Sequence, residues 1–245
     1  MRLLHSLRGR CLMLMRICGY QGDALFFGVR FPVRLAPSPT IIRHLDAQRY
    51  ERAETLLVRQ FLPPGATVLE LGGSLGIVSS VILGGRPLRL VTYEAVPAFA
   101  VIGRQVVAHN FPSADYVCIN EAVGPVDVPE VTFHWSPDQS LAGSAGTASS
   151  EGLGLIRVPA VDLASAVARH GIAPGAWLVA DIEGMEFELL LNQSGAFAPF
   201  AGVIMECHDG EYAGRHRDQR EVETMLASVG FRLLRRIGPV ICMAR

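Results

Sequence analysis

Residues 67–76, Thr-Val-Leu-Glu-Leu-Gly-Gly-Ser-Leu-Gly, constrain the fold more than any other part of the chain. An apolar β-run carries an acidic residue, Glu70, just before a turn of small residues that leads into a helix. A second apolar run then ends at another acid, Glu94. Glycines let a backbone approach a ligand closely, and a carboxylate at the end of the second strand can accept hydrogen bonds from both ribose hydroxyls. The layout predicts a pocket for a nucleoside cofactor.

The spacing of this turn also indicates which cofactor is expected. Glu-x-Gly-x-x-x-Gly differs from Gly-x-Gly-x-x-Gly, whose tight turn seats a pyrophosphate. A carboxylate at that place favours a cationic, phosphate-free cofactor, and S-adenosylmethionine fits this description. We expect Glu70 to face its ammonium group, directly or through water, and Glu94 to hold the ribose. The residues predicted to bind the cofactor are Glu70, Gly72, Gly73, Ser74, Gly76, Glu94, Asn120 and Glu121.

Two alternatives remain open for these residues. The glycines could serve only the packing of a tight strand-to-helix turn, with the acid directed at a helix N-terminus. Asn120 and Glu121, which follow a third predicted strand, are expected beside the adenine amino edge, but a polar residue at a strand end is often only a cap.

Composition excludes several classes of function. The chain has 245 residues, half of them apolar, enough for one α/β domain with a short leader. A formal net charge of −1 gives no general attraction for nucleic acid, so no nucleic-acid partner is expected. The sequence contains no lysine, which removes the P-loop lysine and any lysine Schiff base.

The five cysteines form neither a disulfide framework nor a zinc motif. They are odd in number and widely spaced, with no Cys-x-x-Cys pair. Cys118, Cys207 and Cys242 lie in apolar runs and are expected to be buried thiols. The sequence therefore favours a reducing, cytoplasmic location.

Helical and strand-like segments alternate along most of the chain, which predicts an α/β fold. The sheet is expected to be doubly wound and mostly parallel, with an antiparallel strand at the C-terminal end, as in Rossmann-like folds. We predict strands at 67–71, 89–94, 116–120, 128–135, 155–161, 176–181, 202–207, 231–235 and 240–243, and helices at 46–61, 97–110, 163–170, 183–191 and 219–229. Residues 1–45 are expected to form an N-terminal helix and a small hairpin at 25–35, and residues 46–245 the cofactor-binding domain.

Residues 1–18 form a basic amphipathic pattern, with apolar residues at helical spacing and arginines between them. The apolar run is far shorter than the roughly 20 residues of a membrane span. Residues 1–20 could lie on an anionic membrane surface as a peripheral contact, or pack on the domain or on a partner. Residues 136–154, rich in Ser, Gly and Ala, are either a lid over the substrate or a solvated loop.

Candidate catalytic residues follow two later strands. Asp181 and Glu183, and likewise Glu206 and His208, stand two apart at extended strand ends and so project to one side. Since a histidine pKa lies near working pH, His208 could accept a hydroxyl proton beside the three acids. The alternative is that Asp181 and Glu183 cap a helix start. No metal motif is present and no metal is predicted, although the acids with His208 leave that open.

Six blocks of the sequence, in this order and spacing, resemble those of FkbM-type methyltransferases. They are Val-Leu-Glu-Leu-Gly-Gly-Ser-Leu-Gly at 68–76, Tyr-Glu-Ala-Val-Pro at 93–97, Asn-Glu-Ala-Val-Gly at 120–124, Val-Pro-Ala-Val-Asp-Leu at 158–163, Ala-Asp-Ile-Glu-Gly-Met-Glu at 180–186 and Val-Ile-Met-Glu-Cys-His at 203–208. The resemblance covers about residues 50–235. It implies a class I methyltransferase fold using S-adenosylmethionine, commonly for O-methylation of sugars, polyketides or other secondary metabolites.

The chain departs from the pattern of that family at several positions. The family usually has Asp at Glu70, often Asn at Ser74 and Glu-Pro at residues 94–95, and commonly a lysine at Val179. The leading expectation is a methyltransferase acting on a hydroxyl of a small-molecule or glycan acceptor. The rivals are a catalytically silent cofactor-binding module that docks through its N-terminal helix, and an NAD-dependent oxidoreductase, which the missing Gly-x-Gly-x-x-Gly disfavours.

Overall fold

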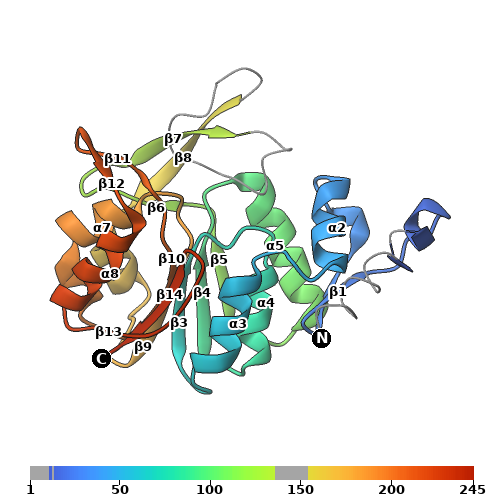
Figure 1. Ribbon diagram of the computed structural model, residues 1–245, viewed down its shortest axis with the longest axis horizontal. Coiled ribbons are helices and arrows are strands. Elements are labelled where there is room, and N and C mark those ends of the chain that lie inside the picture. The colour runs from blue at the N-terminus through green and yellow to red at the C-terminus, as the bar shows by residue number, and fades with distance from the viewer. Residues whose placement is uncertain (1–10, 13, 136–153) are drawn as a thin grey trace.

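The core of the molecule is a twisted sheet with helices on both faces (Figure 1). The computed structural model describes residues 11, 12, 14–135 and 154–245. The strands of the sheet are β3 (Thr67–Leu71), β4 (Arg89–Tyr93), β5 (Tyr116–Ile119), β9 (Ala176–Ala180), β10 (Phe200–Glu206), β13 (Arg232–Ile237) and β14 (Val240–Ala244). Their order is β13-β14-β10-β9-β3-β4-β5.

The pairing of these strands confirms the predicted fold class. β5, β4, β3, β9 and β10 are mutually parallel, and β14 pairs antiparallel with both β10 and β13. The sheet grows outward from β3 through β4 to β5, after which the chain returns to place β9 on the other side of β3. This reversal is the arrangement of a Rossmann-like, doubly wound sheet.

Two apolar clusters fill the spaces between sheet and helices. One face is covered by α3 (Arg52–Phe61), α4 (Ile77–Gly84) and α5 (Pro97–Asn110), and the other by α6 (Leu163–Arg169), α7 (Glu186–Asn192) and α8 (Gln219–Ser228), with a short 3-10 turn, η3 (Ser194–Phe197). Because side chains alternate along a strand, Val68 packs with the first group while Leu69 and Leu71 pack with the second. Glu70 therefore points towards α4.

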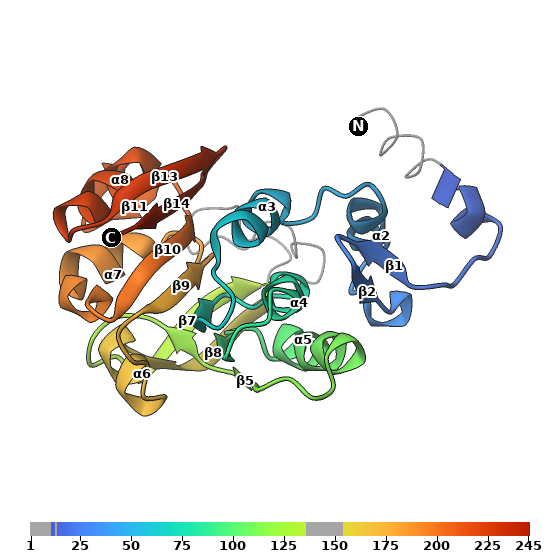
Figure 2. The same cartoon turned by 90° about the horizontal axis from the view of Figure 1, so that it is seen from below.

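The segment from residue 24 to residue 46 packs onto the same core (Figure 2). The predicted hairpin is present as β1 (Ala24–Phe26) and β2 (Val29–Phe31), followed by a 3-10 turn, η1 (Val33–Leu35), and by α2 (Pro39–Asp46). The prediction of one helix over 46–61 is wrong. α2 ends where that helix was expected to begin, and residues 47–51 form a turn before α3. Gln48 and Glu51 adopt left-handed backbone angles there, which a continuous helix excludes.

The remaining strands lie outside the main sheet. β6 (Ala122–Val123), β7 (Glu130–Trp135) and β8 (Gly154–Val161) form a small sheet of their own, while β11 (Gly210–Tyr212) and β12 (Arg215–Arg217) form a hairpin that the sequence did not predict. The proposed lid at 136–154 lies, apart from Gly154, outside the described residues. Residues 1–10 do too, and of the predicted N-terminal helix the structure describes helical residues 11–12 and 14–17.

Two further expectations concern membrane spans and cysteines. None of the helices in the described part of the chain has both the length and the apolar character that crossing a bilayer requires. Cys207 and Cys242 are buried as expected, whereas Cys118 is only half-buried.

Candidate active site

The candidate site lies at the carboxyl edge of the sheet, where the strand order reverses between β3 and β9. In α/β sheets this is where the loops on either side diverge and leave a crevice. The Asp181 amide donates to Leu71 O, and the Gly72 amide donates to Tyr93 O, at 2.9 Å each. The glycine turn after β3 is thus held against the ends of both neighbouring strands.

Each glycine of this turn has a packing reason to be glycine. A Cβ on Gly72, whose φ is +84°, would overlap the carbonyl oxygen of Asp181, and one on Gly73 would overlap the methyl group of Thr92. At Gly76 the Cβ would lie 2.7 Å from Gly103 O. The packing alternative therefore accounts for these glycines without a ligand, and their contact with a cofactor stays a prediction. Ser74 adopts φ +45° without being glycine.

Glu70 is buried rather than open to the edge. Its Oε2 accepts hydrogen bonds from Ser79 Oγ on α4 at 2.5 Å and from Thr92 Oγ1 on β4 at 2.6 Å, while Oε1 is buried with no hydrogen-bond partner among the described residues. Burial raises the pKa of Glu70 to about 7. Glu70 is 1% exposed, so an ammonium group could reach it only through an intermediate water or after a change of the turn.

Glu94 ties the glycine turn to the loop after β4. Its Oε2 accepts from the Ser74 amide at 2.6 Å and its Oε1 from the Val96 amide at 2.7 Å. Burial raises its pKa to about 7, against the lowering effect of these two backbone bonds. Asn120 Nδ2 donates to Glu94 O and Ala95 O at 2.8 and 2.9 Å. Since each carboxylate oxygen has a second lone pair, Glu94 retains acceptor capacity for a ribose hydroxyl.

Asn120 and Glu121 do not act together. The amide of Asn120 secures the loop beside Glu94, which agrees with the capping alternative. Glu121 is instead bound to Arg169 of α6, with 2.6 Å between Glu121 Oε2 and Arg169 Nη1. Their contact with an adenine ring stays a prediction, and Glu121 would have to exchange this ion pair for it.

The four predicted catalytic side chains do lie together. His208 Nε2 is 3.3 Å from Glu183 Oε2, 3.8 Å from Asp181 Oδ1 and 3.9 Å from Glu206 Oε1. The other ring nitrogen, Nδ1, is 2.9 Å from Oε1 of Glu186, whose side chain is fully buried. Glu186 thus fixes the ring so that Nε2 faces the three acids.

These acids set the charge of His208. Burial alone lowers the pKa of His208, but the hydrogen bond and charge of Glu186, followed by the charges of Glu183 and Asp181, raise it to about 9. At neutral pH His208 is therefore an imidazolium and not a free base. Burial, reinforced by repulsion from Glu206 and Glu183, raises the pKa of Asp181.

The predicted start of a helix at Glu183 is wrong, while a capping role of Asp181 and Glu183 stays untested. α7 begins at Glu186, three residues later than predicted, and its N-cap is Met185 with no side-chain hydrogen bond. Glu183 and Gly184 have φ of +52° and +98°, so the chain between β9 and α7 cannot be helical. The acids lie on a turn at the sheet edge.

Sequence reasoning missed several residues that belong to this site. Tyr50 OH lies 2.9 Å from Ser74 Oγ, and burial followed by the charge of Asp181 raises the pKa of the neighbouring Glu51. Glu54 is 5% exposed, and burial followed by a hydrogen bond to Glu206 raises its pKa to about 10. No local signal marked the segment 50–54. Glu186 ends the sequence block 180–186, and no role was predicted for it.

Asp181, Glu206 and His208 are also the residues that could hold a metal. One ligand atom of each lies within 4.8 Å of the others, and carboxylate oxygens with an imidazole nitrogen suit several divalent cations. The expectation of no metal stays untested. Val179, at the position where FkbM-type sequences commonly have a lysine, is buried and pairs with Glu70 in the sheet. It therefore gives the neighbouring acids no cationic partner.

The buried titratable groups predict a stability that falls with rising pH. Glu70 and Glu94 hold a proton more tightly folded than unfolded, so their contribution declines as pH rises from about 4.5 to about 7. Protonated His208 stabilises the folded chain, and this contribution to the free energy of unfolding is lost as pH rises from about 6.5 to about 9. Urea unfolding should give a lower free energy of unfolding at pH 8 than at pH 5.5.

Glu70→Gln is the matched test of this pH effect. The substitution removes one titrating carboxyl with little change of shape, and the decline between pH 4.5 and 7 should shrink by about 1–3 kcal/mol. A pH dependence identical to that of the wild type would show that Glu70 titrates alike in the folded and unfolded chain.

Comparison with known proteins gives no family assignment. No protein-family model and no curated protein sequence matches the chain, so the resemblance to FkbM-type methyltransferases stays a prediction. Among solved structures, similarity is found to a ribosomal protein L11 methylase from Lactobacillus delbrueckii subsp. bulgaricus, with TM-score 0.47 and 15% identity over 80% of this chain and 77% of that one.

Two other similar structures show the same level of likeness. A magnesium protoporphyrin IX methyltransferase from Synechocystis PCC 6803 with bound S-adenosylmethionine gives TM-score 0.47 and 10% identity, covering 84% of this chain and 83% of that one. The pyocyanin biosynthetic protein PhzM gives 0.46 and 16%, covering 89% and 62%. At TM-scores below 0.5 these similarities carry no conclusion about the activity of this chain.

Proposed function

We propose that this protein is an S-adenosylmethionine-dependent methyltransferase acting on a hydroxyl group, with a sugar or another secondary metabolite as acceptor. The observation that carries the proposal is the gathering of Asp181, Glu183, Glu206 and His208 at the reversal of the strand order, next to the glycine turn and Glu94. So many carboxylates favour a cationic ligand over a pyrophosphate.

The residues present fit such a cofactor. Glu94 offers acceptor oxygens at the end of β4, where a ribose diol is expected, and Asp181 Oδ1 is buried without a hydrogen bond among the described residues. When bound, S-adenosylmethionine supplies an electrophilic methyl group. The protein then has to align an acceptor hydroxyl, exclude water and remove one proton.

His208 is the group proposed to take that proton. Glu186 holds Nδ1, which leaves Nε2 facing the site. A sulfonium charge placed beside the acids would lower the pKa of His208, because a nearby cation disfavours the imidazolium. Neutral Nε2 could then accept the hydroxyl proton, and Asp181, Glu183 and Glu206 would stabilise the imidazolium that forms.

Transfer of labelled methyl groups tests the proposal. A panel of glycans and hydroxylated metabolites, together with amine and thiol compounds, is offered to purified protein with labelled S-adenosylmethionine. At least one hydroxyl compound should receive the methyl group as a base-stable O-methyl product. Turnover only of amine or thiol acceptors would contradict the O-methyl assignment.

A second candidate is a catalytically silent, cofactor-binding module that docks on a membrane through residues 1–20. The side chains of Leu14, Met15 and Ile17 are 60%, 48% and 73% exposed, which favours an apolar contact outside the domain. Binding of S-adenosylmethionine without transfer to any acceptor, together with sedimentation on anionic vesicles that removal of residues 1–20 abolishes, would favour this candidate.

A further inference from the structure

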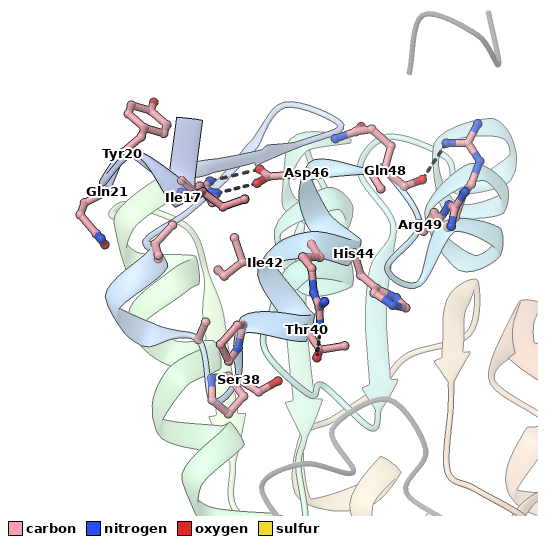
Figure 3. Close-up of a pocket in the computed structure, with 18 of the residues that line it drawn as sticks. Ile17, Tyr20, Gln21, Ser38, Thr40, Ile42, His44, Asp46, Gln48 and Arg49 are labelled. Carbon is pink, nitrogen blue, oxygen red and sulfur yellow. Dashed lines mark hydrogen bonds and ion pairs between the residues drawn. The ribbon is translucent and has the colours of Figure 1, made fainter. Parts of the chain in front are cut away.

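A large cavity lies between the N-terminal segment, α2 and the start of α3 (Figure 3). Its volume is about 1340 Å³, enough for a drug-sized molecule. Apolar side chains line part of it, among them Val33, Ile42, Leu56 and Ile237. The cavity is therefore not a purely polar surface hollow.

The charge of this cavity is opposite to that of the acid cluster. Arg16, Arg43, Arg49 and Arg52 line it, and Asp46 is the carboxylate among the lining residues. Asp46 is already neutralised, because Arg16 Nε and Nη2 donate to its two oxygens at 2.6 and 3.1 Å. Figure 3 shows this pair at one end of α2.

The other three arginines have no carboxylate within ion-pair distance among the described residues. Arg43 donates to Thr40 Oγ1 at 2.8 Å, and Arg52 donates to Gln48 O at 3.1 Å and stacks over the ring of Phe27. Arg43 and Arg49 are exposed. A guanidinium group without a carboxylate partner binds phosphate well, because its planar N–H donors match the spacing of two phosphate oxygens.

The turn at 47–51 connects the cavity to the candidate site, because Ala47, Gln48 and Arg49 line the cavity. Tyr50, next to Arg49, is hydrogen-bonded through its hydroxyl to Ser74 Oγ of the glycine turn. The charge of Asp181 contributes to the raised pKa of the neighbouring Glu51. On the other side, Ile237 pairs with Val240, which pairs with Glu206. A molecule with its anionic end among the arginines would thus lie close to the acid cluster without placing its charge there.

We propose that this cavity binds a phosphate ester that carries an apolar group, with the phosphate among Arg43, Arg49 and Arg52. That this ester is also the methyl acceptor rests on the proposed methyltransferase function. The binding of the ester to the cavity does not depend on that function. The phosphate could belong to a soluble ester or to a lipid headgroup, and both have the same recognition chemistry.

Calorimetry with n-octyl phosphate below its micelle concentration tests the cavity, with n-octyl glucoside as the neutral match. The wild type should bind the phosphate at least about tenfold more tightly than the glucoside, and less tightly at higher salt. The double variant Arg43→Gln/Arg49→Gln should lose about tenfold or more in affinity for the phosphate. Arg220→Gln, an exposed arginine on α8, is the matched control and should bind like the wild type.

Equal affinity for the two octyl compounds, or unchanged affinity in the double variant, would overturn the proposal. An unchanged urea-unfolding transition shows that the double variant keeps its fold, and binding of S-adenosylmethionine is measured independently of it, so the two assignments fail separately. Vesicles distinguish the sources: a lipid headgroup predicts sedimentation with phosphatidylglycerol but not phosphatidylcholine vesicles, weakened in the double variant. A soluble ester predicts octyl phosphate binding without sedimentation.

Discussion

His208→Ala is expected to lower the rate of methyl transfer about 10²–10⁴-fold, the range for loss of a general base. Binding of S-adenosylmethionine should change little, because His208 contacts acids and not the glycine turn. Initial rates with the acceptor found in the panel, at saturating cofactor, measure the effect. The wild-type rate should also rise with pH towards the pKa that His208 has with the cofactor bound, below its value of about 9 in the ligand-free chain, and the variant should lose that rise.

The matched control for this variant is His216→Ala, an exposed histidine on β12. It should retain the wild-type rate and pH profile. Asp181→Asn keeps the shape of the side chain and removes a charge beside His208, so its rate should fall as well. A His208→Ala enzyme that turns over at the wild-type rate would remove His208 from the chemistry and leave the acids as the remaining candidate bases.

Gly72→Ala is expected to cost roughly 3–5 kcal/mol of unfolding free energy, among the largest effects of a point change. The added Cβ overlaps the carbonyl oxygen of Asp181, at a φ of +84° that favours glycine. The overlap can be removed only if the glycine turn moves away from the end of β9. Cofactor binding should therefore be lost even where the protein stays folded. Urea unfolding and calorimetry with S-adenosylmethionine measure the two effects.

Gly175→Ala separates the overlap from backbone strain. Gly175 has a φ of +94°, but a Cβ there would meet no atom within 4 Å. The free energy of unfolding of this variant should fall by only roughly 1–2 kcal/mol, the cost of a left-handed backbone conformation for alanine, and its cofactor affinity should be unchanged. If Gly72→Ala proved no less stable than Gly175→Ala, the close approach between the turn and β9 would not be a real constraint.

Most of the central sheet could be predicted because its signals are local. α5 begins at Pro97, a residue preorganised for the first helical turn, and its bounds are the predicted ones. The apolar runs that become β3 and β9 are bounded by acids and glycines. α2 was not predicted, although Pro39 stands at its first helical position, where the fixed φ of proline suits a helix start.

The composition of the site was less predictable than its position. The acids of β9 and β10 were found because strand ends in a parallel sheet meet at one edge. Glu54 and Glu186 were not, because their contacts with Glu206 and His208 join segments far apart in the sequence. The charge of His208 likewise depends on these tertiary neighbours, so the sequence alone suggested a free base where the folded chain has an imidazolium.

Titration of ligand-free protein with S-adenosylmethionine in a calorimeter is the most direct measurement of the whole account. One molecule should bind per chain, as should its demethylated product, with affinity lost in Gly72→Ala and no heat from NAD. Absence of heat with both adenosyl compounds, from protein whose unfolding is cooperative, would mean that the acids and glycines at this edge serve the fold and not a cofactor.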